Sequence, residues 1–188
     1  MFERIECSKY SFVTATNSRT AEISKFDNNK YFHIAIETFN NLSKIYSNFE
    51  FKIIGSIKNE EYYKYLSDLI DCKNIKILSD ISNEEKNNIL STTQYYIQLT
   101  GFEDKYFSNQ EHFGITLIEA LNYQCIPICF SGGYAPYILD DRYLVKNRQE
   151  LYKYLNDILS YKKKLDPVKY QLDKYSNLKF IDNFSNFL

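Results

Sequence analysis

The chain has 188 residues, which is enough for one well-buried domain and too few for two ordinary ones. A hydrophobic content of 44% with 25% charged residues is typical of a soluble globular protein and excludes a disordered chain. The formal net charge of −1 gives no long-range attraction toward nucleic acid, so nucleic-acid binding is not expected as the main activity.

Short β-rich runs alternate with longer helical stretches along the chain. The expected strands cover 11–16, 49–55, 74–78, 95–99, 126–130 and 143–145. The expected helices cover 31–47, 60–71, 82–93, 114–123 and 147–163, with a short helical piece at 134–139. This alternation predicts βαβ units, and therefore an α/β fold with a Rossmann-like parallel sheet of about six strands and helices on both faces. We expect this domain to cover 1–166 and a C-terminal helical tail to cover 167–188, with the boundary near Pro167.

The four cysteines are not arranged as a metal or disulfide motif. No C-x-x-C pair occurs, so a zinc site is not expected. Cys125 and Cys129 flank a strand-like run, and side chains four apart on a strand are roughly 13 Å apart, too far for a disulfide. Buried, reduced thiols in a cytosolic protein are the expectation.

Two further patterns bear on location. The N-terminal segment MFERIECSKY is charged and lacks the apolar stretch of a signal peptide. No uninterrupted run of about 18 apolar residues is present, so no transmembrane segment is expected. The sequence therefore predicts a cytoplasmic location, with peripheral association with a membrane left open.

The segment EHFGITLIEAL (111–121) carries the strongest signal for chemistry. Gly114 lies where a loop enters a helix, so the backbone N–H groups of Gly114, Ile115 and Thr116 are expected to point outward unpaired. Together with the helix dipole they form an anion site suited to a diphosphate. Glu111 precedes the helix and Glu119 lies on it, and carboxylates accept hydrogen bonds from the paired hydroxyls of a sugar or a ribose.

Glu111, seven intervening residues and Glu119 match the E-x7-E motif of GT-B-fold, family-4-type retaining glycosyltransferases, and HFGITLIEAL is similar to the GFG-x-x-x-x-EA segment of that family. Other segments resemble the family in the same order: DNNKYFHIAIETFNNL, FKIIG, NIKILSDISNEEKNNIL and CIPICFSGG. The resemblance covers about 11–160. It implies a hexosyltransferase that uses a UDP- or GDP-sugar and no other cofactor. The absence of a D-x-D triplet agrees with the metal independence of this fold.

The resemblance also implies roles for particular residues. Arg19 and Lys30 are similar to the basic pair that contacts the donor diphosphate, where cations stabilise the charge of the leaving group; Lys25 is an alternative to Lys30. Glu111 would hold the donor sugar and Glu119 the ribose. The residues expected to line the rest of the donor site are Gly55, Leu78, Ser79, His112, Phe113, Gly114, Ile115 and Thr116.

Several positions depart from the family pattern. The loop before Glu111 is longer than usual, and His112 stands where the family commonly has glycine. Gln124 also replaces a usual glycine, and Pro136 occurs where an acidic residue is common. Arg19 has a simpler interpretation as a solvated loop cation, and His33 as a structural helix residue.

GT-B enzymes have two Rossmann-like domains, and this chain resembles only the C-terminal one. The glycan, lipid or protein acceptor would then be bound by an N-terminal-type domain or a partner chain. A catalytically incomplete module that only binds a nucleotide sugar is the alternative. An epimerase or dehydrogenase is disfavoured, because no G-x-G-x-x-G follows the first strand.

Overall fold

The computed structural model describes residues 10–15, 30–57, 59–102, 111 and 114–168. Its strands form one six-stranded sheet in the order β3-β2-β1-β4-β5-β6, and each pair of neighbouring strands is parallel. The strands are β1 (Tyr10–Ala15), β2 (Phe49–Gly55), β3 (Ile75–Ser79), β4 (Tyr95–Gln98), β5 (Ile126–Phe130) and β6 (Leu144–Val145). The expected Rossmann-like α/β fold is confirmed.

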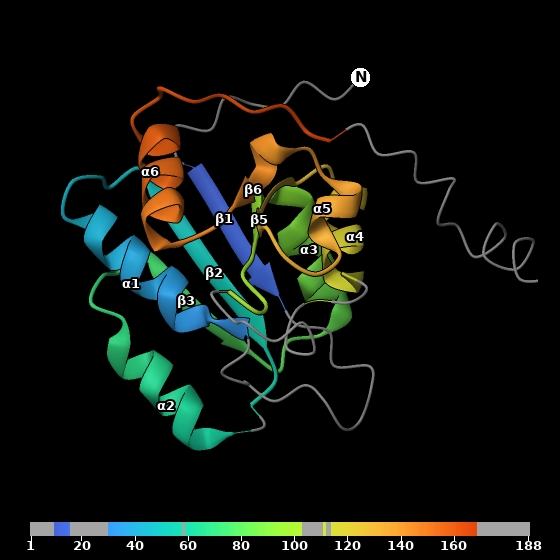
Figure 1. Cartoon of the computed structure of the whole chain (residues 1–188). Helices are drawn as coiled ribbons and strands as arrows, with labels where there is room; N and C mark the ends of the chain where they lie inside the picture. Colours follow the sequence, from blue (N-terminus) through green and yellow to red (C-terminus); the bar gives the residue numbers. More distant parts are fainter. Residues whose placement is uncertain (1–9, 16–29, 58, 103–110, 112–113, 169–188) are drawn as a thin grey trace, which may run out of the picture.

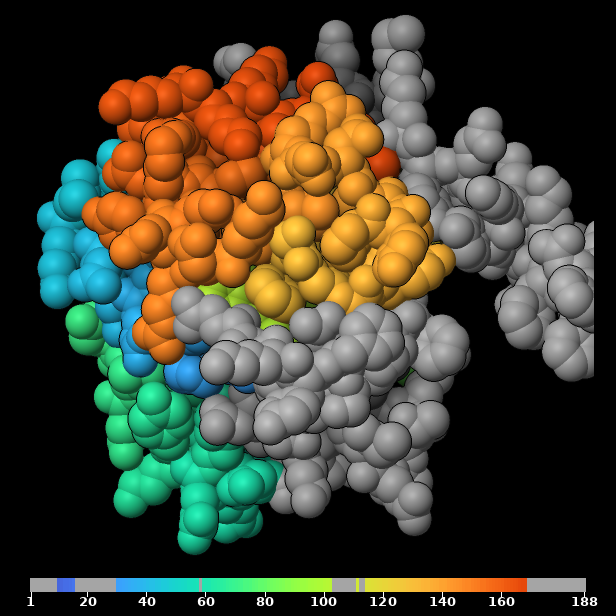
Figure 2. Space-filling view, in the orientation of Figure 1, coloured from blue at the N-terminus to red at the C-terminus, as the bar shows by residue number. Residues whose placement is uncertain are grey.

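Helices cover both faces of this sheet, as Figure 1 shows. The helices are α1 (Phe32–Ser43), α2 (Glu60–Leu69), α3 (Asn83–Thr92), α4 (Ile115–Asn122), α5 (Ala135–Ile138), the 3-10 turn η3 (Asp141–Tyr143) and α6 (Arg148–Leu159). Helix α1 packs against both α2 and α6, so these three lie on one face, while α3, α4 and α5 lie on the other. In the space-filling view, α5 and α6 form the upper part of the visible face and α1 and α2 its left and lower margin (Figure 2). Within the described residues, no helix combines the length and apolar character needed to cross a membrane.

The strand order has one point at which the chain changes direction across the sheet. From β1 the chain proceeds to β2 and β3 on one side, and it then crosses to β4, which pairs with β1 on the other. In open α/β sheets, ligands bind at such a point, beside the carboxyl ends of the strands. The segments that follow the strands at this edge are therefore where a site is expected.

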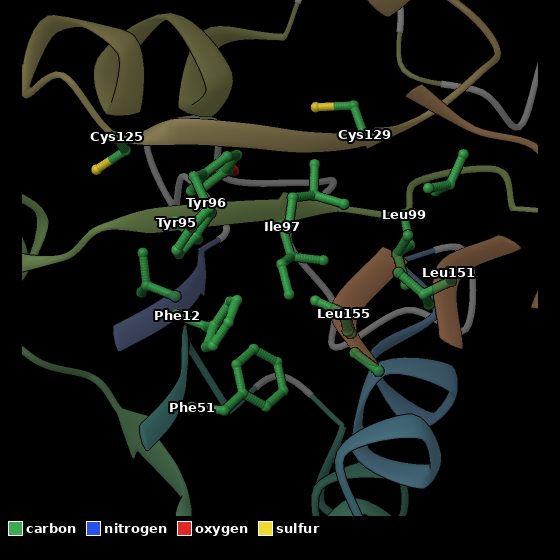
Figure 3. Close-up of a cluster of buried hydrophobic side chains, with 14 of the residues drawn as sticks. Phe12, Phe51, Tyr95, Tyr96, Ile97, Leu99, Cys125, Cys129, Leu151 and Leu155 are labelled. Carbon is green, nitrogen blue, oxygen red and sulfur yellow. The ribbon is translucent and has the colours of Figure 1, made fainter. Parts of the chain in front are cut away.

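Strands β1 and β4 form the centre of the core because they are covered on both faces. Phe12 stacks on Tyr95 with ring centroids 5.0 Å apart, and Phe39 of α1 stacks on Phe51 at 4.5 Å. Figure 3 shows Phe12, Phe51 and the residues of β4 gathered with Leu151 and Leu155 of α6. The tightly packed central strands therefore hold the loops at their carboxyl ends in place.

The described cysteines, Cys72, Cys125 and Cys129, are not in disulfides. Cys125 and Cys129 are buried, and they lie at opposite ends of the β5 segment in Figure 3. Burial, aided by the negative charge of Glu111, raises the pKa of the Cys129 thiol well above its ordinary value. The expected burial is confirmed for these two; Cys72 is half-buried, and Cys7 lies outside the described residues.

Two predicted helices end earlier than expected. Helix α1 stops at Ser43 rather than 47, and α6 stops at Leu159 rather than 163. Ile45 falls at helical spacing from the apolar residues of α1, which suggested a longer helix, but its side chain is 62% exposed. The chain turns after Ser43 to enter β2, and Tyr46 faces inward instead, donating a hydrogen bond to Oδ1 of Asn156 at 3.0 Å.

Helix α3 begins with a capping box. The Ser82 side chain accepts a hydrogen bond from the Glu85 backbone N–H at 3.1 Å, and Glu85 Oε2 accepts one from the Ser82 backbone N–H at 2.9 Å. Two otherwise unpaired donors at the helix start are thereby satisfied.

Helix α4 ends in a Schellman motif that explains why glycine is usual at position 124. The N–H of Cys125 donates to the carbonyl of Ala120 at 3.0 Å, and the N–H of Gln124 donates to that of Leu121 at 2.9 Å. This geometry requires a left-handed residue after the helix, and Gln124 has φ 61°. A side chain with a Cβ adopts that conformation at a cost of about 1 kcal/mol.

We predict that Gln124→Gly raises the free energy of unfolding by about 0.5 kcal/mol, because relief of the left-handed strain outweighs the greater freedom of glycine in the unfolded chain. Urea unfolding followed by circular dichroism measures the change. Gln124→Ala keeps a Cβ and serves as the matched control without the gain. Equal stability of the glycine and alanine variants would contradict this account.

Candidate functional site

Residues far apart in the sequence meet at the carboxyl edge of the sheet. Lys30 directly precedes α1, and Glu111 precedes α4. The Lys30 Nζ lies 3.5 Å from Glu111 Oε2, and the two side chains are about one-quarter exposed, at 27% and 24%. Two residues expected to serve the same ligand are therefore an ion pair at the predicted edge.

The carboxylate of Glu111 is held from several directions. Its Oε1 accepts a hydrogen bond from the Gly114 backbone N–H at 3.1 Å. Its Oε2 accepts one from Nε2 of Gln98, the last residue of β4, at 3.0 Å. Lys30 Nζ also lies 3.4 Å from the hydroxyl of Thr100, two residues after β4. The end of β4 and the start of α1 are therefore both linked to the Glu111 carboxylate. Gln98 and Thr100 were missed at the sequence level, because nothing in YYIQLT marks them as polar partners of a loop glutamate.

The backbone of Glu111 is fixed by the Ser-Gly-Gly turn after β5. The N–H of Tyr134 donates to the Glu111 carbonyl at 2.8 Å. Gly133 has φ +58°, and a Cβ at this position would lie 2.2 Å from the same carbonyl oxygen. Position 133 therefore requires glycine for its conformation and also for the close approach of Glu111.

Helix α4 starts at this point. Gly114 is its N-cap in the left-handed conformation, with φ 62°. The expectation that the Gly114 N–H is unpaired was wrong, because the side chain of Glu111 accepts from it. Ile115 is 59% exposed at the start of the helix, whereas Thr116 is buried.

Glu119 lies one turn along α4 and pairs with a lysine of the neighbouring helix. Lys86 Nζ of α3 donates to Glu119 Oε2 at 2.9 Å. Lys86 is only 7% exposed, so this is a mostly desolvated cation, while the Glu119 side chain is 30% exposed. Lys86 was missed at the sequence level, because it is a single lysine among the polar residues of α3.

The second half of the predicted site lies across the sheet. Gly55 and Ser79 end β2 and β3 and are paired in register, and Leu78 precedes Ser79. The Gly55 carbonyl accepts a hydrogen bond from the Asp80 N–H at 3.0 Å. Strand spacing places the end of β3 about 14 Å from that of β4, so only an extended ligand reaches both.

Some predicted residues lie outside the described part of the chain. These are Arg19, Lys25, His112 and Phe113, whose roles stay predictions. His33 is half-buried with Nδ1 3.4 Å from the Tyr62 hydroxyl, and burial lowers its pKa despite the opposing effect of Glu37. A neutral, packed imidazole agrees with its interpretation as a structural residue. In the described ranges, no group of three or more His, Cys, Asp and Glu residues is arranged to hold a metal ion.

The chain matches the family model described as "Glycosyl transferases group 1" over residues 16–174. It belongs to the glycosyl transferases group 1 family. None of the curated proteins compared matched the sequence.

In solved structures, the same fold forms one half of GT-B glycosyltransferases. The C-terminal domain of a glycosyl transferase group 1 family protein (LpcC) from Francisella tularensis is 19% identical, with a TM-score of 0.59 over 80% of this chain and 75% of that one. The catalytic domain of cholesterol-α-glucosyltransferase from Helicobacter pylori is 18% identical, with a TM-score of 0.54 over 79% and 89%. A chain of the GtfA/B complex is 16% identical with a TM-score of 0.67, and the match covers 96% of this chain but 35% of that one.

Gly114 and Gly133, two left-handed glycines at the site of this glycosyl transferase domain, give a matched test of the geometry. A Cβ at Gly114 would meet only ordinary contacts, the nearest at 3.5 Å, whereas one at Gly133 would overlap the Glu111 carbonyl. We predict that Gly114→Ala costs about 1 kcal/mol of unfolding free energy, and that Gly133→Ala costs about 3 kcal/mol. Urea unfolding of both variants checks this order. Equal costs would mean that the Ser-Gly-Gly turn does not pack on Glu111 as described.

Proposed function

We propose that the chain is the donor-binding domain of a retaining, family-4-type hexosyltransferase that uses a UDP- or GDP-sugar without a metal ion. The observation that carries this proposal is the Lys30–Glu111 pair, which meets at the start of α4 where the strand order changes direction. A cation, a hydrogen-bond acceptor and a helix N-terminus within one small region suit a sugar diphosphate.

The proposed roles of Glu111, Glu119 and Lys30 combine their positions with the family resemblance, and that of Arg19 rests on the resemblance alone. Glu111 accepts hydrogen bonds from donor-sugar hydroxyls, and Glu119 accepts them from the ribose. The leaving nucleoside diphosphate gains negative charge, which Lys30, Arg19 and the N-terminus of α4 stabilise. An acceptor hydroxyl attacks the anomeric carbon from the same face, so the configuration is retained.

The comparisons support a nucleotide-sugar ligand at the level of the family. One structural neighbour, 9% identical with a TM-score of 0.64, is described as bound with UDP-2-fluoro glucose, and another as complexed with UDP and GlcNAc. The GtfA/B neighbour is itself a complex, which favours a partner chain or N-terminal-type domain as the supplier of the acceptor side. The acceptor, whether glycan, lipid or protein, would then bind at the junction. A cytoplasmic location, peripheral to a membrane where the acceptor is lipid-linked, is part of the same proposal.

A catalytically incomplete nucleotide-sugar-binding module is the second candidate. The chain spans 35% of the chain of the GtfA/B complex that it matches, so binding and transfer have to be tested separately. Hydrolysis or transfer of the sugar from a UDP- or GDP-sugar by the chain, alone and with an N-terminal-type domain, separates enzyme from module.

We predict that the chain binds UDP or GDP, and that Glu119→Ala weakens this binding at least about tenfold by removing acceptors for the ribose hydroxyls. Isothermal titration calorimetry measures both affinities. Glu50→Ala is the control, because Glu50 also pairs with lysines, 3.0 Å from Lys52 and 3.1 Å from Lys76, but near the opposite end of β2. Binding of neither nucleotide, or equal losses in both variants, would overturn the proposed site.

We predict that Lys30→Met weakens binding of the nucleoside diphosphate about tenfold and leaves binding of the matching nucleoside unchanged, because a charged hydrogen bond to the diphosphate is lost. Lys76→Met removes an exposed lysine away from the site and is the control. Competition titrations with UDP and uridine, or GDP and guanosine, measure the difference. A parallel loss for diphosphate and nucleoside would place Lys30 elsewhere on the ligand.

A further inference from the structure

Gln98 is an unusual residue for its position. It is the last residue of β4, a central strand in which all four residues are buried, and it is itself only 7% exposed. The other residues of this strand are Tyr95, Tyr96 and Ile97. A polar amide in such a place needs partners for both its donor and its acceptor atoms.

Only half of that requirement is met within the described residues. Nε2 of Gln98 donates to Glu111 Oε2 at 3.0 Å, whereas Oε1 is buried and has no hydrogen-bond partner. The orientation follows from charge, because an ionised carboxylate only accepts hydrogen bonds and the amide must turn its NH₂ group toward it. Because the NH₂ group of Gln98 is turned toward Glu111, its Oε1 is left without a hydrogen-bond partner.

A buried, unpaired acceptor lowers the stability of the fold, and an apolar side chain of similar shape would avoid that cost. Stability given up at one residue is common where the residue supports a site. The hydrogen bond that Gln98 makes is to the carboxylate that the proposed function assigns to the donor sugar. The presence of glutamine at position 98 is therefore better explained by its hydrogen bond to Glu111 than by packing in the core.

We propose that Gln98 is a positioning residue that holds the Glu111 carboxylate in the orientation in which it meets the donor sugar. This inference rests on the proposed function and adds a residue to it. Gly114 N–H binds Oε1 and Gln98 Nε2 binds Oε2, so each oxygen of the Glu111 carboxylate is held by a neutral donor. Lys30 lies farther away, at 3.5 Å, and its charge can serve the diphosphate.

The test uses Gln98→Met, which keeps length and volume but removes the donor and the unpaired acceptor. Calorimetry gives the affinity for UDP or GDP and for the nucleotide sugars UDP-glucose, UDP-N-acetylglucosamine and GDP-mannose. The affinity for a nucleotide sugar divided by that for its nucleotide, here called the sugar ratio, measures the contribution of the sugar to binding. We expect this ratio to fall about fivefold to tenfold, with nucleotide affinity within about twofold of the wild type. We also expect an equal or higher temperature of thermal unfolding.

Two further variants distinguish positioning from a structural role. With Glu111→Gln in the background, Gln98→Met should change the sugar ratio less than twofold, since the two residues act through one interaction. Gln98→Glu places two carboxylates side by side, which repel at about pH 7.5 but share a proton at about pH 5. Its sugar ratio should therefore recover as the pH falls, while that of Gln98→Met stays low.

The outcomes separate this inference from the function on which it rests. If the wild-type chain binds none of these nucleotides, the proposed function fails and the inference fails with it. If nucleotides bind but the sugar ratio of Gln98→Met is unchanged, the inference alone fails. A parallel loss of thermal stability and nucleotide binding in Gln98→Met would show that Gln98 is a structural residue and would equally overturn it.

Discussion

The anchoring of Glu111 is the constraint on which the rest of the site depends. The residue lies outside any helix or strand, yet its carbonyl bonds the turn after β5, and its carboxylate bonds the end of β4 and the start of α4. Three elements that are rigid in themselves thus meet at one loop residue. The approach of Gly133 to the carbonyl fixes the backbone so closely that only a residue without a Cβ fits there. A carboxylate on a loop acquires in this way the fixed geometry that recognition of a sugar requires.

The sheet order explains why these elements meet. Because β4 lies beside β1, the segment that follows β4 lies next to the start of α1, and Lys30 reaches Glu111 across that junction. The fold of this family therefore places a cation and a carboxylate from distant parts of the sequence at the same edge. The aromatic packing between β1 and β4, with Phe12 stacked on Tyr95, holds the strands that lead to this edge in place.

Much of this arrangement could be predicted from the sequence. Hydrophobic periodicity located the strands to within about a residue, since buried central strands form short apolar runs bounded by turns. The spacing of Glu111 and Glu119 and the position of Lys30 at a helix start indicated which residues share the site. The end of α1 was misplaced, because Ile45 fits the apolar period although its side chain is exposed.

The supporting contacts could not be predicted in the same way. Lys86 and Gln98 acquire their importance from partners 33 and 13 residues away, and neither spacing belongs to a helix or strand period. The Gly114 N–H was expected to be available because sequence alone cannot show that Glu111 turns back to accept from it. Gly133 belongs to a segment that resembles the family, but its contact with Glu111 depends on how two loops pack.

The two site carboxylates each have a lysine, and the lysines differ in how freely they can move. Lys86 is almost fully buried, with a side chain 9% exposed, so its charge remains with Glu119 whether or not a ligand is bound. Lys30 is 27% exposed and farther from its partner, so turning toward an incoming diphosphate costs it little. If Lys30 moves in this way, the neutral donors Gln98 and Gly114 still hold Glu111 as the nucleotide arrives. The buried amide at the end of β4 is needed for this reason: it is a partner that the diphosphate cannot draw away.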